Sequence, residues 1–351
     1  MASYPHSRPV FTYQFSLRKH LLLRKLLNNP HIKNIRSLAA ITEPADLYVW
    51  GAAELRDRHP SGHRIIRVED GFIRSIGLGA ALKAPQSWCL DPLGLYLDAT
   101  RPSLLETVLE NNTFTFSEIA RAAALRQRII ASGITKYNLG GSTWQRPRHA
   151  GRVLLVPGQV ESDESLRFGL PEFSSNLALV KHVRAINPLA YLVFKTHPDV
   201  SAGLRPPSAT DQQVALYCDE SVKDVSTSAL LDSVDEVHTL TSLIGFEGLL
   251  RGKTIFVYGQ PFYAGWGLTH DYRQNERRTR RLSIDELIAG CLIEYPYYFP
   301  GIAKGSDTPE DVIVRLRLES QRLAAQGDLT RFLHSLKHVA IRASVRCLGQ
   351  R

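Results

Sequence analysis

Short apolar segments alternate with amphipathic segments along most of the chain. Apolar runs rich in β-branched and aromatic residues predict strands at 46–51, 64–68, 152–156, 191–195, 236–240 and 254–259. Between these runs, apolar side chains recur at helical spacing at 103–111, 116–132 and 176–186. Alternation of strand and helix is typical of parallel sheets covered by helices, so we predict an α/β fold.

The polar segment GGSTWQRPRHAG, residues 140–151, interrupts this alternation. It contains glycine, proline and arginine, and a buried strand is predicted directly after it. We therefore predict two Rossmann-like domains, residues 1–145 and 146–351, whose parallel sheets face each other across a cleft. The second domain is expected to end in a helical, basic tail after about residue 281.

Two segments are both basic and amphipathic, LRKHLLLRKLLNN at 17–29 and TRFLHSLKHVAIRASVR at 330–346. Such segments can dock on an anionic membrane face. They can equally be helices whose apolar side covers the core while the lysines stay in water. The pattern alone leaves both interpretations open.

The composition narrows the class of protein. The formal net charge of +9 suits nucleic acid, anionic lipid or an acidic small substrate. No helix-turn-helix, RNA-stacking or zinc-finger signature is present, so we expect no nucleic-acid partner. No apolar run approaches the ~20 residues that span a bilayer, and the first residues lack the charged start and apolar middle of a secretory signal. We therefore expect a cytoplasmic protein, whose four scattered cysteines are reduced thiols.

The segment YLVFKTHPD, residues 191–199, places a histidine directly after a predicted buried strand. Ligands of parallel α/β sheets bind beyond the carboxyl ends of the strands, which is where His197 lies. Pro198 disfavours helical backbone at His197 and keeps it extended. Lys195 projects to the same side as long as strand geometry lasts. A lysine and a histidine converging there would bind a phosphate, although a histidine in this position can also simply pack.

The next predicted strand, EVHTL, is followed by TSLIGFEGLLRGK, residues 241–253. Thr241 and Ser242 begin a helix, whose free N–H groups and partial positive charge favour a phosphate. Glu247, further along the helix, could accept hydrogen bonds from a ribose diol. Alternatively, Thr241 only caps the helix and Glu247 is solvated.

Two acidic segments follow strand ends. In RVEDGFIRS, residues 67–75, Glu69 and Asp70 could deprotonate an acceptor hydroxyl, or form a turn held by arginine. In VPGQVESDES, residues 156–165, crowded carboxylates raise one another's pKa or require a cationic neighbour. The second segment could also be a polar loop in which Asp163 caps the following helix.

The segment QPFYAGWGLT, residues 260–269, combines two glycines with aromatic rings. Tyr263 and Trp266 could form a wall against a sugar ring or pack within a turn. No H-E-x-x-H, clustered His/Cys or D-x-D pattern is present, so we expect neither a metal nor another cofactor.

Seven motifs in order resemble the β-Kdo glycosyltransferases of capsule polysaccharide synthesis in Gram-negative bacteria, over roughly residues 46–300. They are RVEDGFIRSIGLG, GLYLDATRPS, TKYNLG, VPGQVESDES, FKTHPDV, HTLTSLIGFEGLLRGK and VYGQPFYAGWGLT. The resemblance implies a GT-B-like fold, CMP-Kdo as the donor, and retention of configuration through a covalent sugar–enzyme adduct. It also implies that the first domain binds the acceptor and the second the donor.

The resemblance makes Asp163 the nucleophile and Asp70 a candidate base. The chain departs from the family at Ser162, where an acid is common, and at Thr196, where proline is common. The candidate residues fall into three groups: catalytic residues Asp163, Asp70, Glu69 and Glu161; donor-binding residues Gln159, Lys195, His197, Pro198, Thr241, Ser242 and Glu247; and a sugar or acceptor wall of Arg74, Lys136, Asn138, Tyr263 and Trp266.

The expected partners are CMP-Kdo, an anionic glycolipid or polysaccharide acceptor, the inner-membrane surface and capsule assembly proteins. Two alternatives remain open at this stage. One is an inverting transferase that uses another CMP-activated acidic sugar. The other is a non-catalytic protein that binds or exports polysaccharide.

Overall fold

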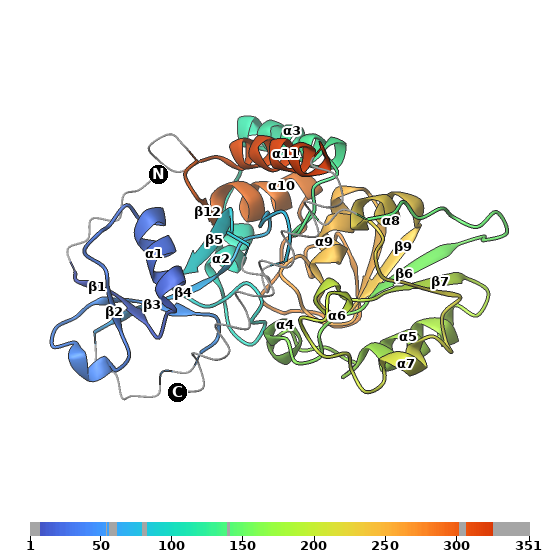
Figure 1. The fold of residues 1–351 in the computed structure, drawn as a ribbon, viewed down its shortest axis with the longest axis horizontal. Coiled ribbons are helices and arrows are strands. Elements are labelled where there is room, and N and C mark those ends of the chain that lie inside the picture. The colour runs from blue at the N-terminus through green and yellow to red at the C-terminus, as the bar shows by residue number, and fades with distance from the viewer. Residues whose placement is uncertain are drawn as a thin grey trace.

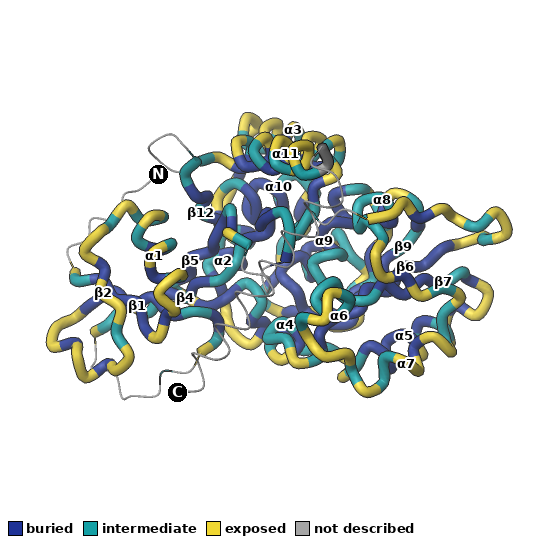
Figure 2. Tube along the Cα trace, in the orientation of Figure 1, coloured by how far each residue is buried: buried dark blue, intermediate teal, exposed yellow. Residues whose placement is uncertain are grey.

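Two lobes lie side by side along the long axis of the molecule, and each is built around a six-stranded sheet (Figure 1). This computed structural model describes residues 8–53, 55, 62–78, 83–138, 141–301 and 307–325. Most residues of the inner strands of both sheets are buried, whereas exposed residues follow the edge strand Lys33–Ile35, the outer loops and the outer faces of the helices (Figure 2). The predicted α/β class with two Rossmann-like lobes is confirmed.

The strands of both sheets are short. In spatial order, the first sheet contains β12 (Pro296–Tyr298), β5 (Ser87–Asp91), β4 (Arg64–Asp70), β3 (Asp46–Trp50), β1 (Val10–Tyr13) and β2 (Lys33–Ile35). The second contains β11 (His270–Asp271), β10 (Thr254–Val257), β9 (Glu236–Thr239), β6 (Val153–Pro157), β7 (Tyr191–Lys195) and β8 (Glu220–Val222).

Helices cover both sheets. They are α1 (Leu17–Leu26), α2 (Leu104–Asn111), α3 (Phe116–Ala131), α4 (Glu164–Phe168), α5 (Asn176–Ile186), α6 (Pro198–Ser201), α7 (Asp211–Val214), α8 (Thr227–Ser233), α9 (Leu243–Leu250), α10 (Ile284–Ile288) and α11 (Pro309–Ala325). A 3-10 turn, η1, spans Leu38–Ala40, and one π-helical turn, η3, spans Ala289–Glu294.

The predicted strands and helices coincide with observed elements to within a few residues. For example, β7 spans Tyr191–Lys195 and α5 spans Asn176–Ile186, as the hydrophobic pattern indicates. Every strand pair of the second sheet is parallel. In the first sheet, β5 runs antiparallel to both β4 and β12, so that sheet is mixed rather than purely parallel.

The division of the chain at residues 145/146 does not hold for the C-terminal part. β12 pairs with β5 in register Pro296 with Cys89, so the chain returns to the first lobe after completing the second sheet. The helices α3, α10 and α11 lie together beside this crossing (Figure 1). The physical reason is edge pairing: β12 satisfies the backbone groups along the outer edge of β5.

One continuous hydrophobic core joins the two lobes. The ring of Phe72, after β4, lies 4.4 Å from the ring of Phe262, which follows β10. Tyr96 of the first lobe contacts both rings, at 4.7 Å from Phe72 and 5.8 Å from Phe262. Since such aromatic pairs bury large apolar surfaces, this contact holds the lobes in a fixed orientation. We call Phe72, Tyr96 and Phe262 the aromatic seam.

A buried ion cluster crosses between the lobes next to this seam. Glu106 of α2 accepts hydrogen bonds from Arg277 at 2.6 Å and from Arg278 at 2.9 Å. The Arg278 guanidinium also donates to the carbonyl oxygens of Pro261 and Ala264, at 2.6 and 2.7 Å. Because Pro261 precedes Phe262, this cluster fixes the backbone that carries one ring of the aromatic seam.

The basic segment at residues 17–29 forms α1, and the segment at 330–346 lies outside the described residues. Leu23 of α1 packs in the core, whereas Leu17 and Leu21 are 70% and 50% exposed. The helix therefore covers the core with one side and exposes leucines on another. Of the described helices, none is long and apolar enough to cross a membrane.

We predict that Glu106→Gln lowers the free energy of unfolding by about 3 kcal/mol, because Arg278 is then left as a buried, uncompensated cation. Urea titration at neutral pH measures this change. The matched control is Glu310→Gln, which breaks the more exposed pair with Arg121 and is expected to cost about 1 kcal/mol or less. Equal losses in the two variants would contradict the role of the Glu106 cluster.

Candidate functional site

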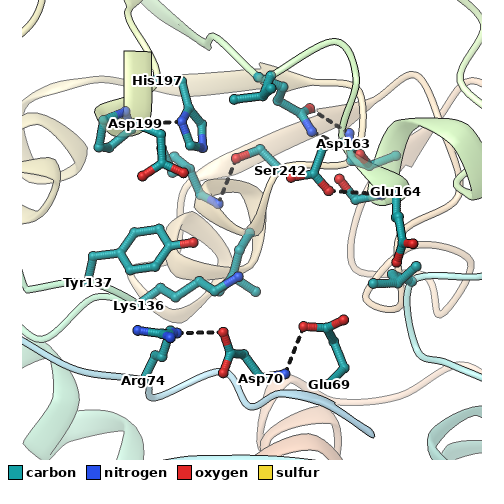
Figure 3. A pocket seen from close by; sticks show the side chains of 18 of the residues that line it. Glu69, Asp70, Arg74, Lys136, Tyr137, Asp163, Glu164, His197, Asp199 and Ser242 are labelled. Carbon is teal, nitrogen blue, oxygen red and sulfur yellow. Dashed lines mark hydrogen bonds and ion pairs between the residues drawn. The ribbon is translucent and has the colours of Figure 1, made fainter. Parts of the chain in front are cut away.

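A cavity of about 670 Å³ lies between the lobes, where strand ends of the two sheets approach each other. From the first lobe, β3 and β4 end at it, and from the second, the loops after β6, β7 and β9 line it. Of the candidate residues from the sequence, it is lined by Glu69, Asp70, Arg74, Lys136, Gln159, Asp163, His197, Pro198, Thr241, Ser242 and Glu247. Figure 3 shows Glu69, Asp70 and Arg74 on one side, His197, Asp163 and Ser242 on the other, and Lys136 between them.

His197 ends the loop after β7 and caps α6, with an extended backbone at φ −60° and ψ 135°. Its Nδ1 accepts a hydrogen bond from the backbone N–H of Asp199 at 3.1 Å. In the neutral ring the proton therefore sits on Nε2, which becomes a hydrogen-bond donor. Burial lowers the pKa of His197, although the carboxylates of Asp199 and Asp163 oppose this shift. A bound anion raises the pKa of a nearby histidine, so His197 could donate through Nε2–H when neutral and become a cation when a phosphate binds.

Asp163 caps α4, and its Oδ1 accepts the N–H of Ser165 at 3.0 Å. The cap fixes the carboxylate at the cavity, where it lies close enough to His197 and Lys136 to influence the pKa of both. The next residue, Glu164, accepts the backbone N–H of Ala52 from the first lobe at 3.2 Å. The loop after β6 is thus held from both lobes.

The start of α9 is positioned by Gln159. Its amide Oε1 accepts the N–H of Thr241, and its Nε2 donates to the Thr241 hydroxyl, both at 2.9 Å. Ser242 caps the helix by accepting the N–H of Ile244 at 3.2 Å. The hydroxyl of Tyr263 donates to the Ser242 carbonyl at 2.5 Å, and Gly245 leaves the space that this tyrosine occupies. Gln159 therefore acts as a support that aims the positive end of α9 at the cavity.

In the first lobe, Asp70 is held on both oxygens. Arg74 donates to Oδ2 at 2.5 Å, and the Trp88 indole donates to Oδ1 at 3.2 Å. Burial and the neighbouring Asp70 charge raise the pKa of Glu69 to about 7. Glu69 can therefore gain or lose a proton near neutral pH.

Lys136 lies at the centre of the cavity. Burial alone lowers the pKa of Lys136, but its acidic neighbours, among them the carboxylates of Asp70, Glu69 and Asp163, outweigh burial and raise it, so Lys136 is a fixed cation. Its backbone N–H donates to Glu247 of α9 at 2.7 Å, and its carbonyl accepts from Ser75 at 3.3 Å. The segment around Lys136 is thus tied to both lobes.

The structure places Lys195 away from the cavity. Its side chain is only 3% exposed, and its Nζ donates to the carbonyl oxygens of Val225 and Lys223, at 2.8 and 3.3 Å. The expectation that Lys195 and His197 converge on one phosphate is therefore wrong. Strand alternation does not continue through the turn between the two residues, so their side chains separate.

Two further candidates serve the scaffold. Glu161 does not line the cavity, because it accepts the N–H of Asn176 and the hydroxyl of Ser208, at 3.0 and 2.7 Å. Asn138 binds the carbonyl of Ser75 at 3.0 Å and has a left-handed backbone at φ 47°. Both side chains fix loops around the cavity and are not among its lining residues.

The aromatic wall is formed by different residues from those predicted. Tyr263 and Trp266 are fully buried, and the Trp266 indole donates to the Phe262 carbonyl at 2.8 Å. Pro261 and Phe262 of the same segment line the cavity instead. The sequence motif was correct in location, but the loop geometry turns the other side chains toward the cavity.

Sequence reasoning missed part of the lining. Trp50 ends β3 and lines the cavity. Its position at the carboxyl end of a predicted strand could have identified it as a lining residue. Arg18 and Lys19 belong to α1, where the amphipathic pattern indicated only a surface helix. Among the described residues, no group of three or more His, Cys, Asp or Glu side chains is arranged to hold a metal ion.

We predict that Glu247→Gln raises the free energy of unfolding at pH 8, by up to about 3 kcal/mol. Burial raises the pKa of Glu247 to about 7 from an ordinary value of 4.5, despite the Lys136 N–H and the charge of Arg251. Between these values the folded protein keeps a proton that the unfolded chain releases, so stability falls as pH rises through pH 4.5 to 7. Glutamine keeps the acceptor for Lys136 and removes this loss.

Urea titrations at pH 4.5 and pH 8 check the difference between variant and wild type. The gain is expected at pH 8 and not at pH 4.5. Exposed Glu276→Gln is the matched control and should leave the pH dependence unchanged. A stability difference that is the same at both pH values would show that Glu247 does not titrate as stated.

The cavity and fold have counterparts in known proteins. A family model for capsule polysaccharide biosynthesis proteins matches residues 122–298, about half of the chain. The chain is 42% identical over 293 residues to the capsule polysaccharide modification protein LipA of Neisseria meningitidis serogroup B, which covers 81% of this chain and 42% of LipA. It is 39% identical over 324 residues to the lipopolysaccharide-processing protein LpsZ of Rhizobium meliloti, covering 90% of this chain and 73% of LpsZ. The chain thus spans less than half the length of LipA.

Two solved structures from Thermosulfurimonas dismutans KpsC share the fold. The β-Kdo 2,7-transferase matches with a TM-score of 0.75 and 38% identity over 89% of this chain and 99% of its own. The β-Kdo 2,4-transferase matches with a TM-score of 0.80 and 29% identity over 90% of this chain and all of its own. The GT-B-like arrangement expected from the sequence motifs is confirmed by these matches. The chain belongs to the family of capsule polysaccharide biosynthesis proteins.

Proposed function

We propose that this protein is a retaining β-Kdo glycosyltransferase, which moves Kdo from CMP-Kdo to a glycolipid or polysaccharide acceptor. The observation that carries the proposal is the match to a β-Kdo 2,7-transferase over nearly that structure's whole length, at 38% identity. The cavity between the lobes supports it, because cationic groups and carboxylates meet there. The protein would act at the cytoplasmic face of the inner membrane, beside capsule assembly proteins, without a metal or another cofactor.

The second lobe would hold the donor. The Nε2–H of His197 and the start of α9 at Ser242 supply donors for the CMP phosphate. Lys136 adds a fixed positive charge between the lobes. Because cytidylate leaves as an anion, its departure needs positive charge rather than a strong acid.

The reaction would proceed in two displacements. An oxygen of the Asp163 carboxylate attacks the anomeric carbon while the bond to the phosphate oxygen breaks and CMP takes the electron pair. The acceptor hydroxyl then attacks the same carbon and releases Asp163, so that two inversions give net retention. Glu69 accepts the acceptor's proton, because its pKa of about 7 lies near the working pH. Asp70 orients the side chains of Arg74 and Trp88, which both donate hydrogen bonds to its carboxylate.

We predict that Asp163→Asn abolishes transfer and leaves CMP affinity within about twofold. The amide keeps the oxygen that caps α4 but cannot form the sugar ester. Transfer is measured with CMP-Kdo generated in situ and a panel of glycolipid acceptors, and NMR reads the configuration of the product. Intact-protein mass spectrometry of wild type after donor addition should detect the mass of one Kdo on Asp163. An inverted product, or substantial transfer by the asparagine variant, would exclude the double displacement.

Glu161→Gln is the control for this loop, because Glu161 lies outside the cavity. It should retain transfer. Purified wild-type protein that neither transfers Kdo nor hydrolyses CMP-Kdo would contradict the proposed function and favour a role in binding polysaccharide.

We predict that His197→Ala weakens CMP binding at least tenfold, since the phosphate loses the Nε2–H donor. Isothermal titration with CMP measures this loss. Cytidine serves as the control ligand, and its affinity should change little because it has no phosphate. Unchanged CMP affinity would assign His197 to packing and helix capping alone.

A further inference from the structure

The first turn of α1 forms one side of the cavity. Arg18, Lys19 and Leu22 line it there, next to Trp50 at the end of β3. The Lys19 ammonium lies 3.2 Å from the centroid of the Trp50 ring, a cation–π contact that fixes its position. Trp50 in turn packs edge-on against Trp88 at 5.3 Å and Phe15 at 6.1 Å. Lys19 is therefore held at the cavity by a rigid aromatic support.

Among the described residues, this side of the cavity is lined by three cations, Arg18, Lys19 and Arg74, and by two carboxylates, Glu69 and Asp70. Lys19 interacts electrostatically with both carboxylates and with the other two cations. Arg74 pairs with Asp70 at 2.5 Å. Burial, opposed by the two carboxylates, lowers the pKa of Lys19 to about 8. A bound anion would replace the lost hydration and balance the charge.

Arg18 and Lys19 lie on the same side of the cavity as Glu69. All three line the cavity from elements of the first lobe, whereas Asp163 lines it from the loop after β6 of the second lobe. Lys19 also lies close enough to Glu69 to influence its pKa. A molecule bound at Glu69 can therefore contact Lys19 without occupying the donor side of the cavity.

We propose that Arg18 and Lys19 form an acceptor subsite that binds a negatively charged group of the acceptor while its reacting hydroxyl lies at Glu69. This inference rests on the proposed transfer reaction and names the part of the site that selects the acceptor. The anion is either the carboxylate of an acidic sugar or the phosphate of a glycolipid anchor. Trp50 and Leu22 add an apolar surface of the kind that contacts sugar C–H groups.

The test compares two double variants of α1 that remove the same charge. Arg18→Gln/Lys19→Gln alters the cavity, whereas Arg24→Gln/Lys25→Gln alters residues of the same helix that do not line it. Steady-state transfer is measured with three synthetic acceptors. The first ends in a Kdo carboxylate on a neutral aglycone, and the second is the methyl ester of the first. The third carries a neutral sugar on a phosphate-linked anchor.

In the Arg18→Gln/Lys19→Gln variant, the KM for a charged acceptor should rise at least tenfold. The KM for the methyl ester should change less than twofold. The KM for CMP-Kdo, and the hydrolysis of CMP-Kdo without acceptor, should stay within twofold. The Arg24→Gln/Lys25→Gln variant should resemble wild type throughout. A loss confined to the first acceptor identifies a carboxylate as the anion, and a loss confined to the third identifies a phosphate.

Equal losses on charged and neutral acceptors, or no loss on either, would overturn the subsite. Thermal unfolding checks both variants, and Arg18→Gln alone replaces the double variant if the latter unfolds. Binding of Kdo methyl glycoside and of glycerol phosphate, followed by NMR titration, does not depend on turnover. Failure of wild type to use CMP-Kdo would refute the proposed reaction, whereas wild-type binding of neither anion, or binding unaffected by the variants, would refute the subsite itself.

Discussion

The contact between the two lobes fixes the position of the two sheets relative to each other, and the cavity depends on that position. Phe72 and Phe262 meet at 4.4 Å across the boundary, and Glu106 joins α2 to the arginines that hold the backbone before Phe262. Phe262 also lines the cavity, so the same residue belongs to the hydrophobic core and to the cavity wall. With the lobes fixed in this way, the ends of strands from two separate sheets remain within reach of one substrate.

The cavity combines acids and bases whose charges are set by different surroundings. Asp70 has both oxygens engaged by Arg74 and Trp88, whereas Glu69 is buried beside it and titrates near pH 7. Lys136 remains charged because the carboxylates of Asp70, Glu69 and Asp163 lie close enough to raise its pKa. A carboxyl group that titrates near neutral pH beside a fixed cation allows one site to move a proton and also hold an anion.

The scaffold around the cavity uses polar residues as supports. Gln159 holds Thr241 through both of its amide atoms, Glu161 holds the start of α5, and Lys195 holds the backbone at Val225. Each of these side chains satisfies a backbone or side-chain group that would otherwise lose its hydrogen bond inside the protein. Their motifs lie near the cavity because the loops that line it need such supports.

The sequence alone determined the elements and the loops that matter. The apolar runs located β3, β4, β6, β7, β9 and β10, and the rule that ligands bind beyond strand ends selected His197 and Glu69. The same rule selected the segment that follows β6, and the family resemblance selected Asp163 within it. The three-residue strands β2, β8 and β12 were not predicted, because so few residues give no measurable alternation. Only the tertiary structure returned β12 to the first sheet, turned Lys195 and Tyr263 inward, and brought Arg18 and Lys19 to the cavity. Periodicity describes one element at a time, whereas the direction of a side chain in a loop, and the partner of an edge strand, depend on packing between segments far apart in the chain.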